Sequence, residues 1–180
     1  MSKESHLVVV GSTMIDMVAY TDKVPHAGET LFGNKFVMGF GGKGANQAVM
    51  ARRFGIKVSM VNTVGDDVFG DTTLTNFQEQ GIDTTYISRT AGASGVAPIW
   101  VEADGTNRII VIPGANSAMN AAQAKSALES LESYQIVIGQ LEIPQAVTTQ
   151  AFKSARERGA ITVLNPAPFA EISPELIAVS

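Results

Sequence analysis

Residues 39–55 read GFGGKGANQAVMARRFG, a glycine-rich loop that runs directly into a segment of helical character. The alanines of this segment allow close packing, and Gly55 is a typical residue just past the end of a helix. A helix is therefore predicted over 42–54. A continuous apolar run at 7–10 precedes it, and a strand-like stretch at 58–62 follows it. Such runs are typical of strands buried on both faces of a parallel sheet, so the stretch predicts a βαβ unit.

The same alternation of helical and strand-like segments continues along the chain. Helical patterns cover 66–80 and the segments that follow Asn120 and Pro144. Apolar, strand-like runs cover 136–141 and 161–164. This order predicts a doubly wound α/β domain, with a mostly parallel sheet and helices on both faces. About four parallel strands is a small sheet for this class, and the sequence stops on Ile-Ala-Val-Ser without a closing element, so we expect a truncated chain.

Two other segments contain short alternating stretches broken by turn residues. The first is 18–38, which is interrupted by proline and glycine. The second is 96–112, where Asp104-Gly105 stands between two strand-like runs and is typical of a hairpin turn. These two segments are predicted to form a small β-sheet. The rest of the chain is predicted to form the α/β core: 1–17, 39–95 and 113–180.

The composition excludes several classes of function. The chain has 180 residues, a formal net charge of −4 and no basic run, so it lacks the electrostatic signature of a protein that binds nucleic acid or an anionic membrane. The absence of cysteine excludes disulfides and thiolate nucleophiles. No apolar run suits a signal peptide or a membrane span, so we expect a cytoplasmic location. His6 and His26 have no carboxylate motif around them and are predicted to lie on the surface.

The glycine-rich loop is the first candidate binding element. Glycine lets a backbone approach a ligand closely, and the start of a helix offers free N–H donors to a polar ligand. Lys43 and Asn46, at positions i and i+3, share a helix face and can reach the same hydroxyl groups. The alternative is a tight turn that only packs the helix against the sheet. The spacing matches neither a Walker loop nor a dinucleotide-binding fingerprint.

Two acidic residues follow predicted strands. If the segment after the first strand stays extended, Ser12, Met14 and Asp16 point to one side. Glu142 follows the strand-like run 136–141, so both carboxylates are predicted at the carboxyl edge of the sheet, where open α/β folds bind ligands. A carboxylate there can accept two hydroxyl protons of a sugar. The alternatives are a capping or turn role for Asp16 and a solvent-facing charge for Glu142.

These motifs belong to a longer series along almost the whole chain. In chain order, the series consists of Gly11–Asp16, Pro25–Thr30, Gly39–Gln47, Val64–Gly70, Ser94–Ala97, Gly114–Asn116, Gln140–Glu142 and Leu164–Pro168. In residue types and order, the series resembles the ribokinase and deoxyribokinase branch of the ribokinase-like carbohydrate kinases. The resemblance implies ATP-dependent phosphorylation of a pentose, ribose or 2-deoxyribose, at its 5-hydroxyl. It also implies a doubly wound domain with a small β-sheet lid.

The resemblance assigns roles to particular positions. It implies that 18–38 and 96–112 are the lid, and that two lids pair in a homodimer. Asp16 and Asn46 are implied to bind sugar hydroxyls. The full set of substrate-binding residues implied by the family's pattern is Met14, Asp16, Gly41, Gly42, Lys43, Asn46 and Glu142.

The family also implies ATP and Mg²⁺, together with a monovalent cation. The motifs that bind the metal-bound phosphates and supply the catalytic aspartate are not found in residues 1–180. No catalytic or cofactor-binding residue is therefore assigned, the general base is expected beyond residue 180, and the chain alone is expected to be inactive. A second hypothesis is a non-catalytic sugar-binding or dimerisation fragment. A nucleotide-dependent oxidoreductase is disfavoured, because no G-x-G-x-x-G follows the first strand.

Met14 bears on which pentose is bound. The resemblance to ribokinases implies an asparagine at this position in many bacterial enzymes, whereas deoxyribokinases place methionine there. A thioether is at best a weak acceptor, so it imposes little penalty when the 2-hydroxyl is missing. The alternative is that Met14 only packs against the lid.

Overall fold

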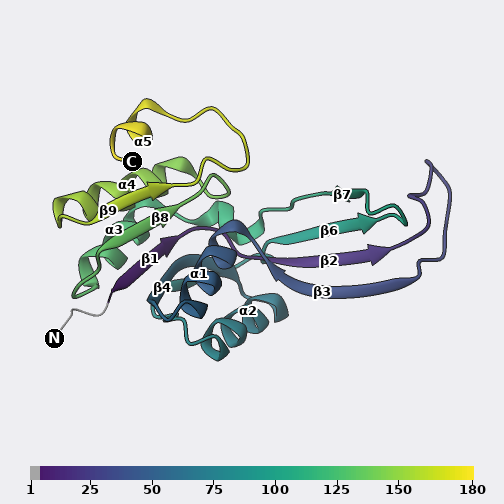
Figure 1. Ribbon diagram of the computed structural model, residues 1–180, viewed down its shortest axis with the longest axis horizontal. Coiled ribbons are helices and arrows are strands. Elements are labelled where there is room, and N and C mark those ends of the chain that lie inside the picture. The colour runs from purple at the N-terminus through teal and green to yellow at the C-terminus, as the bar shows by residue number, and fades with distance from the viewer. Residues whose placement is uncertain (1–4) are drawn as a thin grey trace.

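The computed structural model describes residues 5–180, which form two sheets that lie end to end (Figure 1). The larger sheet has five strands in the order β5-β4-β1-β8-β9, and every pairing in it is parallel. The predicted doubly wound architecture is confirmed, with one strand more than the four expected. Its strands are β1 (His6–Val10), β4 (Lys57–Gly65), β5 (Ile87–Thr90), β8 (Ile136–Gly139) and β9 (Ile161–Leu164).

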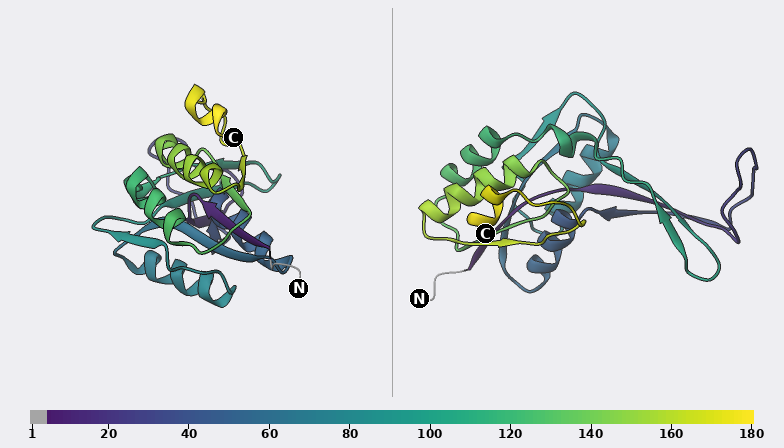
Figure 2. Two further views of the ribbon diagram at one scale, coloured as in Figure 1. Left: turned by 90° about the vertical axis from the view of Figure 1, so that its left-hand side faces the viewer. Right: turned by 90° about the horizontal axis from the view of Figure 1, so that it is seen from above.

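Helices cover both faces of this sheet (Figures 1 and 2). Side chains alternate along β1, so Val8 and Val10 pack on one face, and Leu7 and Val9 pack on the other. The first pair lies in a core with α3 and α4, and the second pair lies in a core with α1 and α2. The apolar run of β1 is therefore buried on both sides, as a central parallel strand requires. The helices are α1 (Lys43–Arg53), α2 (Val68–Glu79), α3 (Ala121–Ser130), α4 (Gln145–Glu157) and the short α5 (Pro174–Ala178).

The starts of the helices differ in how they are capped. The side chain of Asp67 caps α2, and Asn120 caps α3 as predicted, with the Gln123 N–H donating to its Oδ1 at 2.9 Å. Helix α1 begins after Gly42 and has no cap from that residue's side chain. Its first N–H groups are left for partners from elsewhere in the chain.

The smaller sheet projects beyond the carboxyl end of the parallel sheet (Figures 1 and 2). Its strand order is β3-β2-β6-β7, and it is mixed because β2 and β6 run parallel while the other pairs are antiparallel. The predicted hairpin is present at Gly105, which has a positive φ of 86°. The strands start earlier and end later than the predicted segment 18–38, so the small sheet includes residues assigned to the core. Its strands are β2 (Met14–Tyr20), β3 (Lys35–Gly41), β6 (Val96–Val101) and β7 (Asn107–Ile109).

One predicted surface residue is buried. His6 is 5% exposed, and its Nε2 and Nδ1 lie 3.0 Å from Ser59 Oγ and 2.7 Å from the Ser133 carbonyl oxygen. Ser59 in turn donates to Asp83 Oδ2 at 2.7 Å. The surface prediction was wrong for His6 because these polar partners are distant in sequence, whereas His26 is exposed as predicted. None of the helices described between residues 5 and 180 is both long and apolar enough to cross a membrane.

Candidate functional site

The glycine-rich loop brings the start of α1 against the connection between β1 and β2. A Cβ added at Gly42 would lie 2.8 Å from the Thr13 Cα, and φ at Gly42 is 91°. A Cβ at Gly44 would lie 2.7 Å from backbone atoms of Ser12. Contacts this short exclude any side chain, so both glycines are required by packing. The glycine-rich loop therefore packs the start of α1 tightly against the backbone that follows β1.

The carboxylate of Glu142 lies at the start of α1. Its Oε2 accepts the Ser12 hydroxyl at 2.5 Å and the Lys43 backbone N–H at 2.8 Å. The Lys43 Nζ lies 3.7 Å from Oε1, and the Glu142 side chain is only 11% exposed. A carboxylate at a helix N-terminus is favoured both by the free N–H groups and by the helix dipole. Glu142 is thus held by the fold rather than directed into solvent.

Asp16 lies within β2, next to Gly41 of the neighbouring strand. A Cβ at Gly41 would lie 2.3 Å from Asp16 Oδ1, so the carboxylate occupies the space that a side chain at 41 would need. The alternative of a helix cap is wrong for Asp16, since Gly42 precedes α1 and Asp16 is a strand residue. Burial raises the pKa of the Asp16 carboxyl, and the nearby charge of Glu142 raises that pKa further. Two carboxylates therefore converge on the start of α1.

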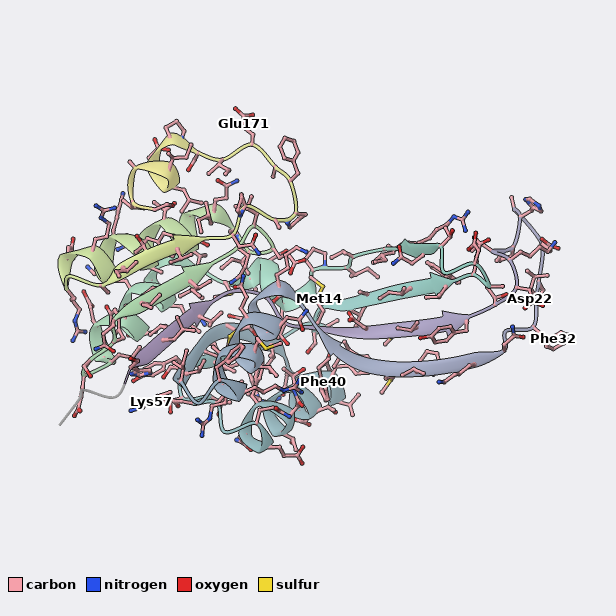
Figure 3. All side chains as sticks on the ribbon, in the orientation of Figure 1. Met14, Asp22, Phe32, Phe40, Lys57 and Glu171 are labelled. Atoms are coloured by element: carbon pink, nitrogen blue, oxygen red, sulfur yellow. The ribbon has the colours of Figure 1, made fainter. Side chains whose placement is uncertain are left out.

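Two other predicted site residues flank this pair. Met14 begins β2, is 3% exposed and lies opposite Gly41 in the sheet register (Figure 3). Asn46, one turn into α1, is exposed and lines a groove of about 390 Å³ between α1 and α2. Phe40 and Arg53 also line that groove. The structure thus gathers Met14, Asp16, Gly41, Gly42, Lys43 and Glu142 at one junction, and Asn46 opens onto the neighbouring groove.

Sequence reasoning missed the part played by Ser12 in this site. Ser12 is fully buried, and besides donating to Glu142 its Oγ lies 3.4 Å from the Gly44 N–H. The Ser12 carbonyl accepts the Ala45 N–H at 2.9 Å. A serine directly after a buried strand was visible in the sequence, but its carboxylate partner is 130 residues away.

Comparison with known proteins identifies the class. The family model described as pfkB family carbohydrate kinase matches residues 4–179, and the chain belongs to this family. It is 42% identical to the deoxyribokinase of Salmonella typhimurium, over 90% of this chain and 53% of that protein. It is also 42% identical to mouse ribokinase, over 97% of this chain and 54% of that protein.

The fold comparison agrees with the sequence comparison. The structure of Arabidopsis thaliana ribokinase complexed with ribose and ATP has a TM-score of 0.88 and 29% identity. That match covers 96% of this chain and 57% of the Arabidopsis chain. The chain therefore spans about half the length of the relatives that it matches.

Among residues 5–180, the side chains that could ligate a metal ion do not cluster. Within the part of the chain that the structure describes, no group of three or more histidine, aspartate or glutamate side chains is placed to hold a metal ion. The N–H donor at the start of α1 is already bonded to Glu142. No residue of this junction is therefore assigned to ATP, Mg²⁺ or a monovalent cation.

The raised pKa of Asp16 predicts an unusual stability effect. Because the folded protein holds the Asp16 proton more tightly than the unfolded chain does, the charged carboxylate destabilises the fold at neutral pH. Asp16→Asn is therefore expected to increase the free energy of unfolding at neutral pH. The gain should stay below about 1 kcal/mol, because water screens this half-buried group. It should shrink as the pH falls through the raised pKa and disappear below about pH 3, where the carboxyl is protonated in both the folded and the unfolded state.

Urea unfolding across this pH range measures the effect. The control is Glu132→Gln, which removes the same charge from an exposed position and should change stability little at any pH. A loss of stability in Asp16→Asn at neutral pH, or a gain that does not depend on pH, would contradict the prediction.

Proposed function

We propose that this chain is the sugar-binding half of a cytoplasmic, ATP-dependent pentose kinase that phosphorylates ribose or 2-deoxyribose at the 5-hydroxyl. The observation that carries the proposal is the convergence of Asp16 and Glu142 on the start of α1, at the base of the small sheet. Membership of the pfkB family supports it, as do relatives named ribokinase and deoxyribokinase.

Each residue of the junction has a proposed role in holding the sugar. Asp16 accepts hydrogen bonds from two sugar hydroxyls, because its carboxylate has several acceptor sites. Glu142 accepts a further hydroxyl at Oε1, while Oε2 stays bonded to Ser12 and to α1. Lys43 donates to a sugar oxygen from the same side as Glu142. The Gly41–Gly42 backbone lets the pentose approach closely.

Asn46 and Met14 complete the proposed sugar site. The Asn46 amide binds a hydroxyl at the mouth of the α1–α2 groove. Met14 contacts the ring at the buried end of β2. The lid then covers the bound sugar, and its exclusion of water strengthens these polar contacts.

Transfer chemistry is assigned to groups outside residues 1–180. When bound, ATP with Mg²⁺ supplies the phosphoryl group, and a monovalent cation accompanies it in the proposed enzyme. The contribution of this chain is to bind the pentose, orient its 5-hydroxyl and exclude water, which are the main sources of rate in phosphoryl transfer. The general base is likewise expected beyond residue 180.

A homodimer formed through the lid is part of the proposal. Phe36, Met38 and Phe40 alternate along β3, so they share one face of the small sheet, and all three are exposed. The sheet also has two edge strands, β3 and β7, whose free backbone groups favour pairing with another strand. These features equally suit the alternative function, a non-catalytic sugar-binding or dimerisation fragment that lacks the ATP site.

Pentose binding tests the proposal directly. Calorimetric titration of the chain with ribose and 2-deoxyribose should show binding, and Asp16→Asn should weaken it about ten- to a hundredfold. Losing a charge-assisted hydrogen bond in a partly buried site costs on the order of 1.5–3 kcal/mol. Asp22→Asn, at the far end of the small sheet (Figure 3), is the matched control and should bind like the parent. Absence of pentose binding by the parent, or equal affinities in Asp16→Asn and the parent, would contradict the proposed site.

An assay of phosphoryl transfer distinguishes a chain that only binds the sugar from a complete kinase. Mixing the purified chain with radiolabelled ATP and either pentose is expected to give no labelled sugar phosphate above a control without protein. A full-length relative assayed in parallel shows that the assay works. Label transfer by residues 1–180 alone would overturn the assignment of the ATP site and base to groups outside them.

The choice of pentose is predicted to depend on Met14. Replacing the thioether in Met14→Asn introduces an amide that can bond the 2-hydroxyl of ribose and is left unpaired by 2-deoxyribose. The ratio of affinities should shift towards ribose by about tenfold or more. Titrations of both variants with both sugars measure this ratio, with Met17→Asn on the opposite face of β2 as the control. An unchanged ratio in Met14→Asn would mean that Met14 only packs against the lid.

A further inference from the structure

The junction between the two sheets is crossed several times by the chain. Between residues 5 and 180 the chain passes from one sheet to the other four times. The passages lie after β1, at the start of α1, before β6 and after β7. A polar side chain that touches several of these passages at once can fix how one sheet is oriented on the other.

Asn116 occupies this position. It lies in the short 3₁₀ helix Gly114–Ala118 that follows the fourth passage, and it is fully buried. Its Oδ1 accepts the Thr13 N–H at 3.0 Å, and its Nδ2 donates to the Thr13 carbonyl at 2.9 Å. The same Nδ2 donates to the Pro113 carbonyl at 2.8 Å. The Asn116 side-chain amide is therefore hydrogen-bonded to the passage after β1 through both its oxygen and its nitrogen. Its nitrogen is also hydrogen-bonded to the passage after β7.

The two remaining passages pack against the same centre. A Cβ added at Gly95, just before β6, would lie 2.4 Å from the Asn116 Nδ2 and 3.0 Å from the Thr13 carbonyl oxygen. Gly42, at the start of α1, lies against the Thr13 Cα as described above. All four passages thus contact either Asn116 or Thr13, to which Asn116 is hydrogen-bonded.

The side chain of Asn116 is also hydrogen-bonded to the parallel sheet. Asn62 of β4, itself fully buried, donates from Nδ2 to Asn116 Oδ1 at 3.1 Å and to the Gly11 carbonyl at 2.6 Å. Both donor protons of Asn116 and both acceptor positions of its oxygen are thereby used. Aspartate offers no pair of donors, and alanine offers neither donor nor acceptor, so asparagine is the side chain that fits.

We propose that Asn116 is a positioning residue that sets the orientation of the small sheet on the parallel sheet. Thr13 is followed directly by Met14 and, two residues further on, by Asp16 within β2. A rotation about Thr13 therefore moves Asp16 relative to Glu142, which stays fixed on the parallel sheet. The effect on orientation is independent of the sugar; the consequence for sugar affinity rests on the proposed function.

The absence of cysteine makes the orientation measurable. Phe32→Cys, at the far end of the small sheet, and Lys57→Cys, at the opposite end of the molecule, provide two exposed sites for spin labels (Figure 3). Pulsed electron paramagnetic resonance spectroscopy then gives the distribution of distances between the two spin labels. The doubly labelled chain should show one narrow distance. The same chain with Asn116→Ala should show a broader distribution or a second distance.

A matched asparagine provides the control. Asn120→Ala removes the cap of α3, four residues away, and destabilises the protein without touching the junction. It should keep the narrow distance of the parent. If Asn116→Ala folds and keeps the parent's distribution, or if Asn120→Ala broadens it equally, the proposal is overturned.

A second variant and a measurement on the parent cover the case in which Asn116→Ala does not fold. Asn116→Asp keeps the shape and the acceptor for the Thr13 N–H but loses the paired donors, and it should also broaden the distribution. In the unsubstituted chain, the Thr13 amide should exchange with solvent as slowly as the amides of β1. Exchange of Thr13 at the rate of an exposed loop would overturn the proposal without any variant.

Sugar affinity provides the functional readout. Ribose affinity in Asn116→Asp should fall by about ten- to a hundredfold, because displacement of Asp16 breaks a charge-assisted hydrogen bond proposed to the sugar, and the loss of one such bond has an effect of this size. Asn120→Ala should bind ribose like the parent. If the parent binds no pentose, the proposed function fails, and the label distances still decide whether Asn116 sets the orientation. A broadened distance distribution in Asn116→Asp together with unchanged ribose affinity would overturn the proposal that Asn116 positions Asp16 for the sugar.

Discussion

The hydrogen bonds of Glu142 hold together the elements on which the site depends. Through Oε2, this carboxylate joins the Ser12 hydroxyl after β1 to the first N–H of α1, and Glu142 itself follows β8. Three elements that are far apart in the sequence therefore meet at one side chain. Glycine at positions 42 and 44 makes these hydrogen bonds of Glu142 possible, because a side chain at either position would push α1 away from the Ser12–Thr13 backbone. The glycine-rich loop thus serves packing first, and that packing brings together the groups proposed to bind the sugar.

The same arrangement places two carboxylates in one partly buried region. Burial and the charge of Glu142 both raise the pKa of Asp16, whereas the carboxylate of Glu142 is compensated by the serine, the lysine and the helix N-terminus. Hydroxyl groups of a ligand would provide Asp16 with the donors that the protein does not. A binding site that is electrostatically unfavourable when empty is typical of functional regions, where stability is exchanged for affinity.

Features encoded locally could be predicted from the sequence, and features encoded by distant partners could not. The cap at Asn120 and the apolar run of β1 depend on residues within a few positions, and both are present as predicted. Strand β5 was missed because Ile87–Thr90 has little apolar character and owes its conformation to pairing with β4. The burial of His6 was missed because Ser133 lies 127 residues away. Asn116 stood in a recognised motif, but its hydrogen bonds to Thr13 span 103 residues.

The topology of the parallel sheet accounts for the place of the site. Strand β1 pairs with β4 on one side and with β8 on the other. The connection that leads to β4 runs through α1 on one face of the sheet, whereas α3 leads into β8 on the opposite face. Chains that leave neighbouring strands in opposite directions open a crevice beyond their carboxyl ends. Ser12 follows β1 and Glu142 follows β8, so the hydrogen bond between them lies at this edge of the sheet, and the small sheet projects beyond the same edge (Figure 1). The candidate site therefore lies at the edge where the winding of the sheet changes direction, and the carboxylates, the lysine and the serine that meet there make that edge polar.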